Sequence, residues 1–170
     1  MPNSFPVSFS VPPVEPDDLG PFLRNQYHLW GTLSPLPGER DRNFLLEAGD
    51  GRRFVVKVAN AQEDRSVLEL QHDALTRIAE RAPELELPRV VPSASGSPLT
   101  TLTLAGRPHL VRLLTWVPGV PLARVNPRTP TQLHSLGRLL ARLHDALEGF
   151  EHPAAGRSLK WDLAHAAWIE

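Results

Sequence analysis

Alternating apolar and polar residues predict two pairs of β-strands. The strand-like segments are 42–47 with 53–59, and 100–105 with 109–117. Asp50 and Gly51 lie between the first two segments, and an Asp-Gly pair flanked by apolar alternation is typical of a tight hairpin turn. Residues 29–33 and 89–91 are shorter strand candidates. The pattern therefore predicts two β-hairpins accompanied by short additional strands.

Three segments have apolar residues at the three- and four-residue spacing of a helix that buries one face. They are residues 19–27, 62–81 and 131–150. Asp17 and Asp18 can cap the first, and Thr129 or Thr131 can cap the last, which Gly149 can help to end. The last pattern is the strongest, with leucines at positions 133, 136, 140, 143 and 147. A coiled coil needs roughly three or four sustained heptads, so we expect a buried helix instead.

Proline and glycine divide the chain into four segments. Five prolines fall within the first 16 residues, so residues 1–18 are expected to form an extended arm. Residues 19–114 contain the predicted strands, and residues 115–121 form a stiff connector rich in proline and glycine. Residues 122–170 begin a second, helical part. Residues 164–169 resemble the start of a further helix and have no closing signal, so we expect the chain to be part of a longer protein.

Composition excludes several classes of function. The formal net charge of −1 lacks the basic excess that general nucleic-acid or anionic-membrane binding requires, so neither partner is expected. No apolar run approaches the roughly 18 residues of a membrane span, and without a recognisable targeting signal the cytoplasm is the default location. The absence of cysteine excludes disulfides and thiolate chemistry. Of the 18 basic residues only Lys57 and Lys160 are lysines, which makes their positions informative.

Lys57 lies in the middle of the predicted strand 53–59. Strand alternation places Lys57 on the same face as Val55 and Ala59, with the intervening apolar residues on the other face. A lysine that points into solvent is the simpler interpretation of this position. However, both sequence neighbours of Lys57 are valines, and the chain otherwise uses arginine almost everywhere. A small point charge at this position therefore indicates a functional residue.

Several motifs occur in the order found in protein-kinase-like phosphotransferases. Residues 54–59 resemble the third-strand lysine motif of that fold. Residues 38–44, Gly-Glu-Arg-Asp-Arg-Asn-Phe, are by themselves consistent with an inert charged loop, but they resemble the loop of the aminoglycoside phosphotransferase family, and most closely its hydroxylysine-kinase-like members. Residues 113–119, 139–144 and 160–163 resemble that family's interlobe hinge, its Leu-Ala-x-Leu-His helix and a Trp-Asp-Leu element. The resemblance spans most of the chain.

This resemblance implies an α+β fold and an activity. The fold would be the N-terminal lobe of a protein kinase, with about five antiparallel strands and one long helix, then a hinge and the first helices of an incomplete second lobe. The nucleotide-binding lobe would be residues 19–114, the hinge 115–121 and the start of the second lobe 122–170. The activity would be transfer of a phosphoryl group from ATP, with Mg²⁺, to the hydroxyl of a small amine-bearing alcohol, for which hydroxylysine is the best single candidate.

The resemblance also implies a set of ATP-binding residues. Lys57 would hold the α- and β-phosphates of ATP, and Val55 would form part of the adenine ceiling. The phosphates would lie under the loop residues Glu39, Arg40, Asp41, Arg42 and Asn43. The adenine edge would pair with backbone groups of the hinge residues Thr115, Trp116 and Val117.

Two departures from the family pattern limit what the chain can do. The third-strand lysine of kinases normally pairs with a helix glutamate, but the matching position here is Gln71, with Glu69 or Asp73 as alternatives if the register differs. The chain also lacks His-x-Asp, Asp-x-x-x-x-Asn and Asp-Phe-Gly, the segments that supply the catalytic base and the metal ligands. We therefore expect no catalytic residue and no magnesium ligand in this chain, and no phosphoryl transfer by this chain alone.

A second class of function is compatible with the same residues. A non-catalytic interaction or regulatory module could retain a kinase-like lobe, and both Gln71 and the missing catalytic loop favour this alternative. A continuation of the chain carrying His-x-Asp-x-x-x-x-Asn would favour the enzyme. In either case the leucine helix 131–150 would lack the remainder of its lobe, so we expect its apolar face to be exposed and the chain to self-associate.

Overall fold

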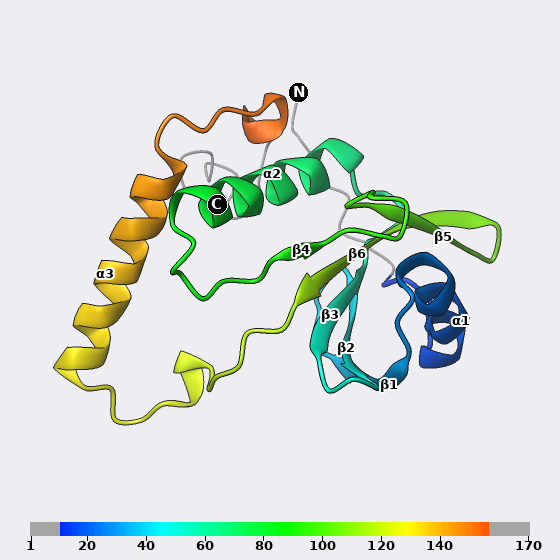
Figure 1. Ribbon diagram of the computed structural model, residues 1–170, viewed down its shortest axis with the longest axis horizontal. Coiled ribbons are helices and arrows are strands. Elements are labelled where there is room, and N and C mark those ends of the chain that lie inside the picture. Colours follow the sequence, from blue (N-terminus) through cyan, green and yellow to red (C-terminus); the bar gives the residue numbers. More distant parts are fainter. Residues whose placement is uncertain (1–10, 157–170) are drawn as a thin grey trace, which may run out of the picture.

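The structure is a computed structural model, and it describes residues 11–156 (Figure 1). Its elements in chain order are α1 (Pro16–Tyr27), β1 (Gly31–Leu36), β2 (Arg42–Ala48), β3 (Arg53–Val58), α2 (Arg65–Arg81), β4 (Val90–Val91), β5 (Thr100–Leu104), β6 (Arg107–Thr115), the 3₁₀ turn η1 (Leu122–Arg124), α3 (Pro130–Leu147) and the 3₁₀ turn η2 (Pro153–Gly156). The α+β prediction is confirmed, with six strands in the sheet where about five were expected.

All strand pairs of the sheet are antiparallel, and the order is β1-β2-β3-β6-β4, with β5 also paired to β6. Both predicted hairpins are present, as β2–β3 and β5–β6. Gly51 lies in the first turn with φ of 85°, in the left-handed region that favours glycine. Lys57 of β3 lies opposite Asn43 of β2 and opposite Arg112 of β6. Directly opposed residues share one face of a sheet, so these three side chains lie on the same face.

The other face of the sheet is apolar and is covered by α1 (Figure 1). Phe44, Val56 and Leu113 lie on this face and are completely buried. Leu19 and Leu23 of α1 pack against them in one hydrophobic cluster. Strand alternation therefore produces the core directly, because alternate residues in the middle of three neighbouring strands are apolar.

The structure places the beginning of α1 at Pro16, inside the segment that was expected to be an extended arm. The N-cap is Glu15, where the sequence had suggested Asp17 or Asp18. Asp18 has a different role, because its carboxylate accepts a hydrogen bond from the Glu15 amide at 2.9 Å. This reciprocal arrangement is a capping box, which satisfies backbone donors that the helix itself leaves unpaired.

The helix α2 packs on the sheet face that carries Lys57. Its Leu68 contacts Ala59 and Leu99 in a second hydrophobic cluster. The side chain of Asp64 caps its first turn by accepting a hydrogen bond from the Ser66 amide at 2.9 Å. The predicted helix 62–81 is therefore present, and it begins three residues later than the pattern suggested.

The leucine helix α3 contacts the rest of the structure mainly through its C-terminal end. Thr129 caps its beginning, as predicted, and Ala146 near its end packs against Ile78 of α2. In contrast, 51% of Leu133 and 57% of Leu140 are exposed. The described part of the chain therefore leaves much of the apolar face of α3 exposed, as expected for a helix without the rest of its lobe and unlike the buried helix that the leucine spacing alone suggested. Neither α3 nor another helix within residues 11–156 has the length and apolar character needed to cross a membrane.

Candidate functional site

The site begins with the Lys57 ammonium, which is held by residues that precede β2 or lie in it. Lys57 Nζ donates a hydrogen bond to Asn43 Oδ1 at 3.0 Å and lies 3.8 Å from Asp41 Oδ2. Asn43 Nδ2 in turn donates to the Pro37 carbonyl at 3.1 Å. Asn43 therefore links the lysine to the loop between β1 and β2. Burial, followed by the positive charge of Arg112, lowers the pKa of Lys57, and Asp41 opposes this shift.

The loop between β1 and β2 requires glycine at position 38. A Cβ atom there would collide with the Asp41 carbonyl oxygen and with the Asn43 side chain. Of the predicted loop residues, Arg40 forms an ion pair with Glu63 at 3.2 Å, which ties the loop to the segment before α2. The loop is thus compact, and it is fixed at Asn43 and at Arg40.

Arg42 is the predicted site residue whose side chain lies away from Lys57. It precedes Asn43 in β2, so strand alternation directs it to the α1 face. There its guanidinium lies 5.5 Å from the centre of the Phe44 ring and 3.4 Å from the Glu15 carboxylate. Arg42 could contribute to a ligand on the Lys57 face only through its backbone. The loop motif predicted Arg42 as a phosphate contact, whereas alternation within β2 directs its side chain to the opposite face of the sheet from Lys57.

The predicted helix partner of Lys57 is replaced in the structure by Asn43 and Asp41. Glu69 of α2 is paired with Arg65, one helical turn away, at 3.2 Å. Asp73 lies 3.7 Å from His152. Gln71 is partly buried on α2, but no Lys57 contact from the helix is found within residues 11–156. The physical reason is that Asn43 lies directly opposite Lys57 in the sheet and Asp41 immediately precedes β2, so their amide and carboxylate reach the ammonium.

Two buried polar residues near Lys57 were not among the residues predicted from the sequence. Arg112 of β6 is 6% exposed and His72 of α2 is 3% exposed. Burial, followed by the Arg112 charge, lowers the pKa of His72 to about 4. Arg112 could have been noticed, because it lies between Leu110 and Leu114 on one face of an apolar strand. His72 gave no such signal, since its position depends on the rotation of α2 against the sheet.

The predicted hinge begins with Thr115, the last residue of β6. The Thr115 amide donates to the Arg89 carbonyl at 2.9 Å, and the Trp116 amide donates to the Arg53 carbonyl at 3.1 Å. Within residues 11–156, the Val117 amide has no backbone partner. Val55, opposite Leu114 in the sheet, lies between this hinge and Lys57 on the same face. Val55 and Lys57 thus lie on one face of the sheet, and the predicted hinge continues from the end of the neighbouring strand β6.

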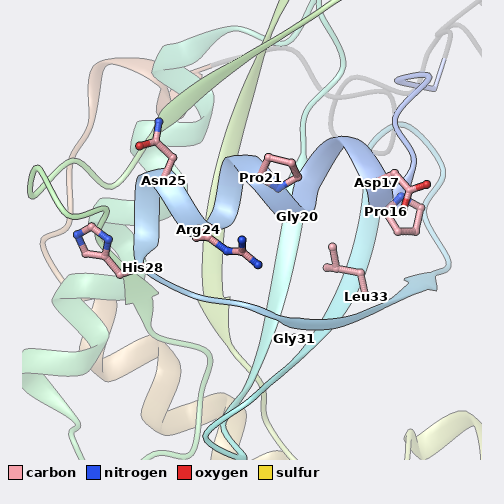
Figure 2. A pocket seen from close by; sticks show the side chains of 9 residues that line it. All are labelled: Pro16, Asp17, Gly20, Pro21, Arg24, Asn25, His28, Gly31 and Leu33. Atoms are coloured by element: carbon pink, nitrogen blue, oxygen red, sulfur yellow. The ribbon is translucent and has the colours of Figure 1, made fainter.

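A pocket of about 710 Å³ lies elsewhere, between α1 and β1 (Figure 2). Figure 2 shows Pro16 and Asp17 at one end of this pocket and His28 at the other, with Leu33 of β1 below the helix. None of its lining residues is a predicted nucleotide contact. In the described part of the chain, no group of three or more His, Cys, Asp or Glu side chains could hold a metal ion.

The comparisons with known proteins identify the family. Residues 32–170 match the family described as "Phosphotransferase enzyme family", and the chain belongs to this family. It is similar to hydroxylysine kinase of Danio rerio, with 31% identity over 128 residues that cover 72% of this chain and 35% of the relative. It is also similar to hydroxylysine kinase of Mus musculus, with 26% identity over 155 residues, or 81% and 40% of the two chains. The chain thus spans 35–40% of the length of these relatives.

Two solved structures show the same fold. A structure of an amicoumacin kinase in complex with AMP-PNP, Ca²⁺ and Ami matches with a TM-score of 0.68 and 16% identity, over 82% of this chain and 42% of that one. A microcompartment-associated aminopropanol kinase matches with a TM-score of 0.65 and 22% identity, over 86% and 45% of the two chains. The predicted kinase-like N-terminal lobe is therefore confirmed as a fold.

Proposed function

We propose that this chain forms the nucleotide-binding part of an ATP-dependent small-molecule kinase. The observation that carries the proposal is the Lys57 ammonium on a central strand, 3.0 Å from the Asn43 side chain that anchors the adjoining loop. This arrangement presents a cation and the backbone of a tight loop on the same face of the sheet. Membership of the phosphotransferase family supports the same function.

Each part of the proposed site has a physical role. The Lys57 ammonium would bind the α- and β-phosphates of ATP, and the backbone amides of residues 39–42 would approach the phosphate oxygens from above. At the hinge, the Thr115 carbonyl would accept from the adenine amino group, and the Val117 amide would donate to a ring nitrogen. Val55 would pack against the adenine ring, since it lies on the face shared by Lys57 and the hinge.

We propose a small amine-bearing alcohol as the phosphoryl acceptor. Hydroxylysine and aminopropanol, the substrates named in two of the similar kinases, each carry both an amine and a hydroxyl group. In the reaction the hydroxyl oxygen forms a bond to the γ-phosphorus, the bond from that phosphorus to the β,γ-bridging oxygen breaks, and the hydroxyl proton passes to a carboxylate base. We place the base and the residues that bind this substrate outside this chain.

We propose that the protein ligands of the magnesium ion used in such a reaction lie outside residues 11–156. These residues contain no cluster of metal-ligating side chains, and the carboxylates nearest the site, Asp41 and Glu63, face Lys57 and Arg40. We therefore infer that magnesium ligands other than the phosphates lie elsewhere in the protein, and that this chain alone does not transfer phosphate.

A thermal melt with and without Mg·ATP tests the nucleotide-binding proposal. Ligand at 100 times its Kd should stabilise the chain by about 2.7 kcal/mol, which corresponds to a rise in Tm of about 5–10 °C. The rise should disappear in Lys57→Ala and persist in Arg107→Ala, a variant of an exposed arginine at the distant end of β6. A wild-type chain whose Tm does not respond to Mg·ATP would contradict the proposal.

We also propose that the purified chain self-associates through α3. Leu133 and Leu140 expose more than half of their surface on the same helix, and burying such a face against a second copy would remove apolar area from water. Light scattering should then report a species larger than the 18.8 kDa monomer. A monomer at all concentrations would contradict this proposal without affecting nucleotide binding.

A further inference from the structure

Arg112 is a buried cation in the middle of β6, directly opposite Lys57 and on the same face of the sheet. Leu110 and Leu114 flank it on that face. Arginine is rarely buried to this extent unless a carboxylate pairs with it, because removing its charge from water is unfavourable. Within the part of the chain that the structure describes, however, the Arg112 guanidinium has no hydrogen bond and no ion pair.

The two carboxylates whose charges act on Arg112 are engaged with other cations. Asp41 lies 3.8 Å from the Lys57 ammonium, and Glu63 forms its ion pair with Arg40 at 3.2 Å. Burial lowers the pKa of Arg112, and the charges of Asp41 and Glu63 oppose this shift without reversing it. Arg112 and Lys57 therefore stand side by side as two cations, and the nearby acids do not fully compensate them.

His72 of α2 adds a second unpartnered polar group to the same interior. It is 3% exposed, and neither ring nitrogen has a hydrogen-bond partner among the described residues. The Arg112 charge helps to lower the pKa of His72 to about 4, so the imidazole is neutral at pH 7. A neutral imidazole cannot serve as a counter-ion for the guanidinium. His72 of α2 thus supplies no negative charge to Arg112.

We propose that Arg112 is a second cationic ligand for the phosphate chain of the nucleotide, acting beside Lys57. This inference rests on the nucleotide-binding function proposed above. A guanidinium has a planar fork of donors that fits two oxygens of one phosphoryl group, whereas the Lys57 ammonium acts as a point charge. A polyphosphate carries charge on successive phosphoryl groups, so two cations on neighbouring strands match it better than they match a single carboxylate.

Binding measurements on the whole 170-residue chain test this role. We expect Arg112→Met to weaken the affinity for ATP by about tenfold or more in titration calorimetry at fixed ionic strength. The affinity for adenosine, which has no phosphate, should change less than about twofold. Arg112→Lys should recover part of the loss, since it restores the charge without the fork. The matched control Arg107→Met removes an exposed arginine from the other end of the same strand and should bind ATP as the wild type does.

The two proposals fail in different ways. If wild-type chain binds ATP and Arg112→Met binds it equally well, the role of Arg112 is overturned and the nucleotide-binding function stands. If adenosine binding falls as much as ATP binding, Arg112 supports the fold and does not contact phosphate, which also overturns the inference. If the wild-type chain binds neither compound, both proposals are overturned.

A measurement on the wild type covers the case in which Arg112→Met does not fold. The ¹⁵N resonance of the Arg112 side-chain Nε–H, assigned through bonds in labelled protein, should shift on addition of tripolyphosphate. Adenosine alone should leave this resonance unchanged. If tripolyphosphate shifts backbone resonances of residues 39–42 but leaves the Arg112 Nε–H resonance unchanged, the inference is overturned.

Discussion

The two faces of the central sheet are built from alternate residues of the same strands, and the side chains at their centres differ in chemistry. Toward α1 the neighbouring positions of β2, β3 and β6 are Phe44, Val56 and Leu113, all fully buried and apolar. Toward α2 the corresponding side chains include Asn43, Lys57 and Arg112. The first face removes apolar surface from water and stabilises the fold. The second places charges where burial is unfavourable, and such local conflict is typical of a functional site.

The contrast also separates two sources of free energy. Apolar contacts on the α1 face contribute to the free energy of unfolding whether or not a ligand is bound. On the α2 face, burial and mutual repulsion lower the pKa of Lys57, so its charged form is destabilised in the folded protein. An anion placed between the two cations would offset this destabilisation. Stability and ligand binding should therefore respond to substitutions on opposite faces.

The largest expected effect tests the apolar face. Phe44→Ala should reduce the free energy of unfolding by about 3–5 kcal/mol, because it leaves a cavity among fully buried neighbours. The adjacent residue Leu45 points to the other face and is only partly buried, so Leu45→Ala should reduce it by about 1–2 kcal/mol. Equilibrium unfolding in urea compares the two variants. Equal losses would break the distinction between the faces.

The next effect is a pH dependence that arises from His72 on the polar face. Its pKa of about 4 lies below the usual 6.5, so the unfolded chain binds the proton more tightly. The contribution of neutral His72 to the free energy of unfolding should be fully present above pH 6.5. It should decrease as the pH falls, by about 3 kcal/mol at pH 4. Besides Arg112, the charges that act on this imidazole are those of Asp73 and Glu69.

Two variants separate titration of His72 from its packing. His72→Leu and His72→Gln both remove the titrating group, while only the glutamine keeps a polar side chain in the interior. Both should lose the His72 contribution, so the difference between wild-type and variant stability should change by about 3 kcal/mol between pH 6.5 and pH 4. Denaturant unfolding across this pH range gives the measurement. A constant difference between wild type and either variant would contradict the burial of a neutral histidine.

The sequence predicted the apolar face, and on the polar face it predicted the residues of β3 but not Arg112 of β6. Alternation alone assigned Lys57 and Val55 to the same side of β3, and the Asp-Gly pair located the first hairpin, because both signals are local. Arg112 could not be placed beside Lys57 in this way. Its neighbourhood depends on the pairing of β3 with β6, strands between which α2, β4 and β5 occur in the sequence. The partner of Lys57 was mispredicted for the same reason. Gln71 was inferred from the spacing along a helix, whereas Asp41, from the segment before β2, lies beside the ammonium.

The smallest expected change in stability comes from Lys57 itself. Lys57→Met removes the hydrogen bond to Asn43, but it also removes a partly desolvated charge that Arg112 repels. These contributions oppose one another, so the free energy of unfolding at pH 7 should change by less than about 1 kcal/mol. Denaturant unfolding measures this change directly, with Phe44→Ala as the contrasting variant. A loss above about 2 kcal/mol would mean that Lys57 is held for the fold, and the polar face would then resemble the apolar face in its contribution to stability.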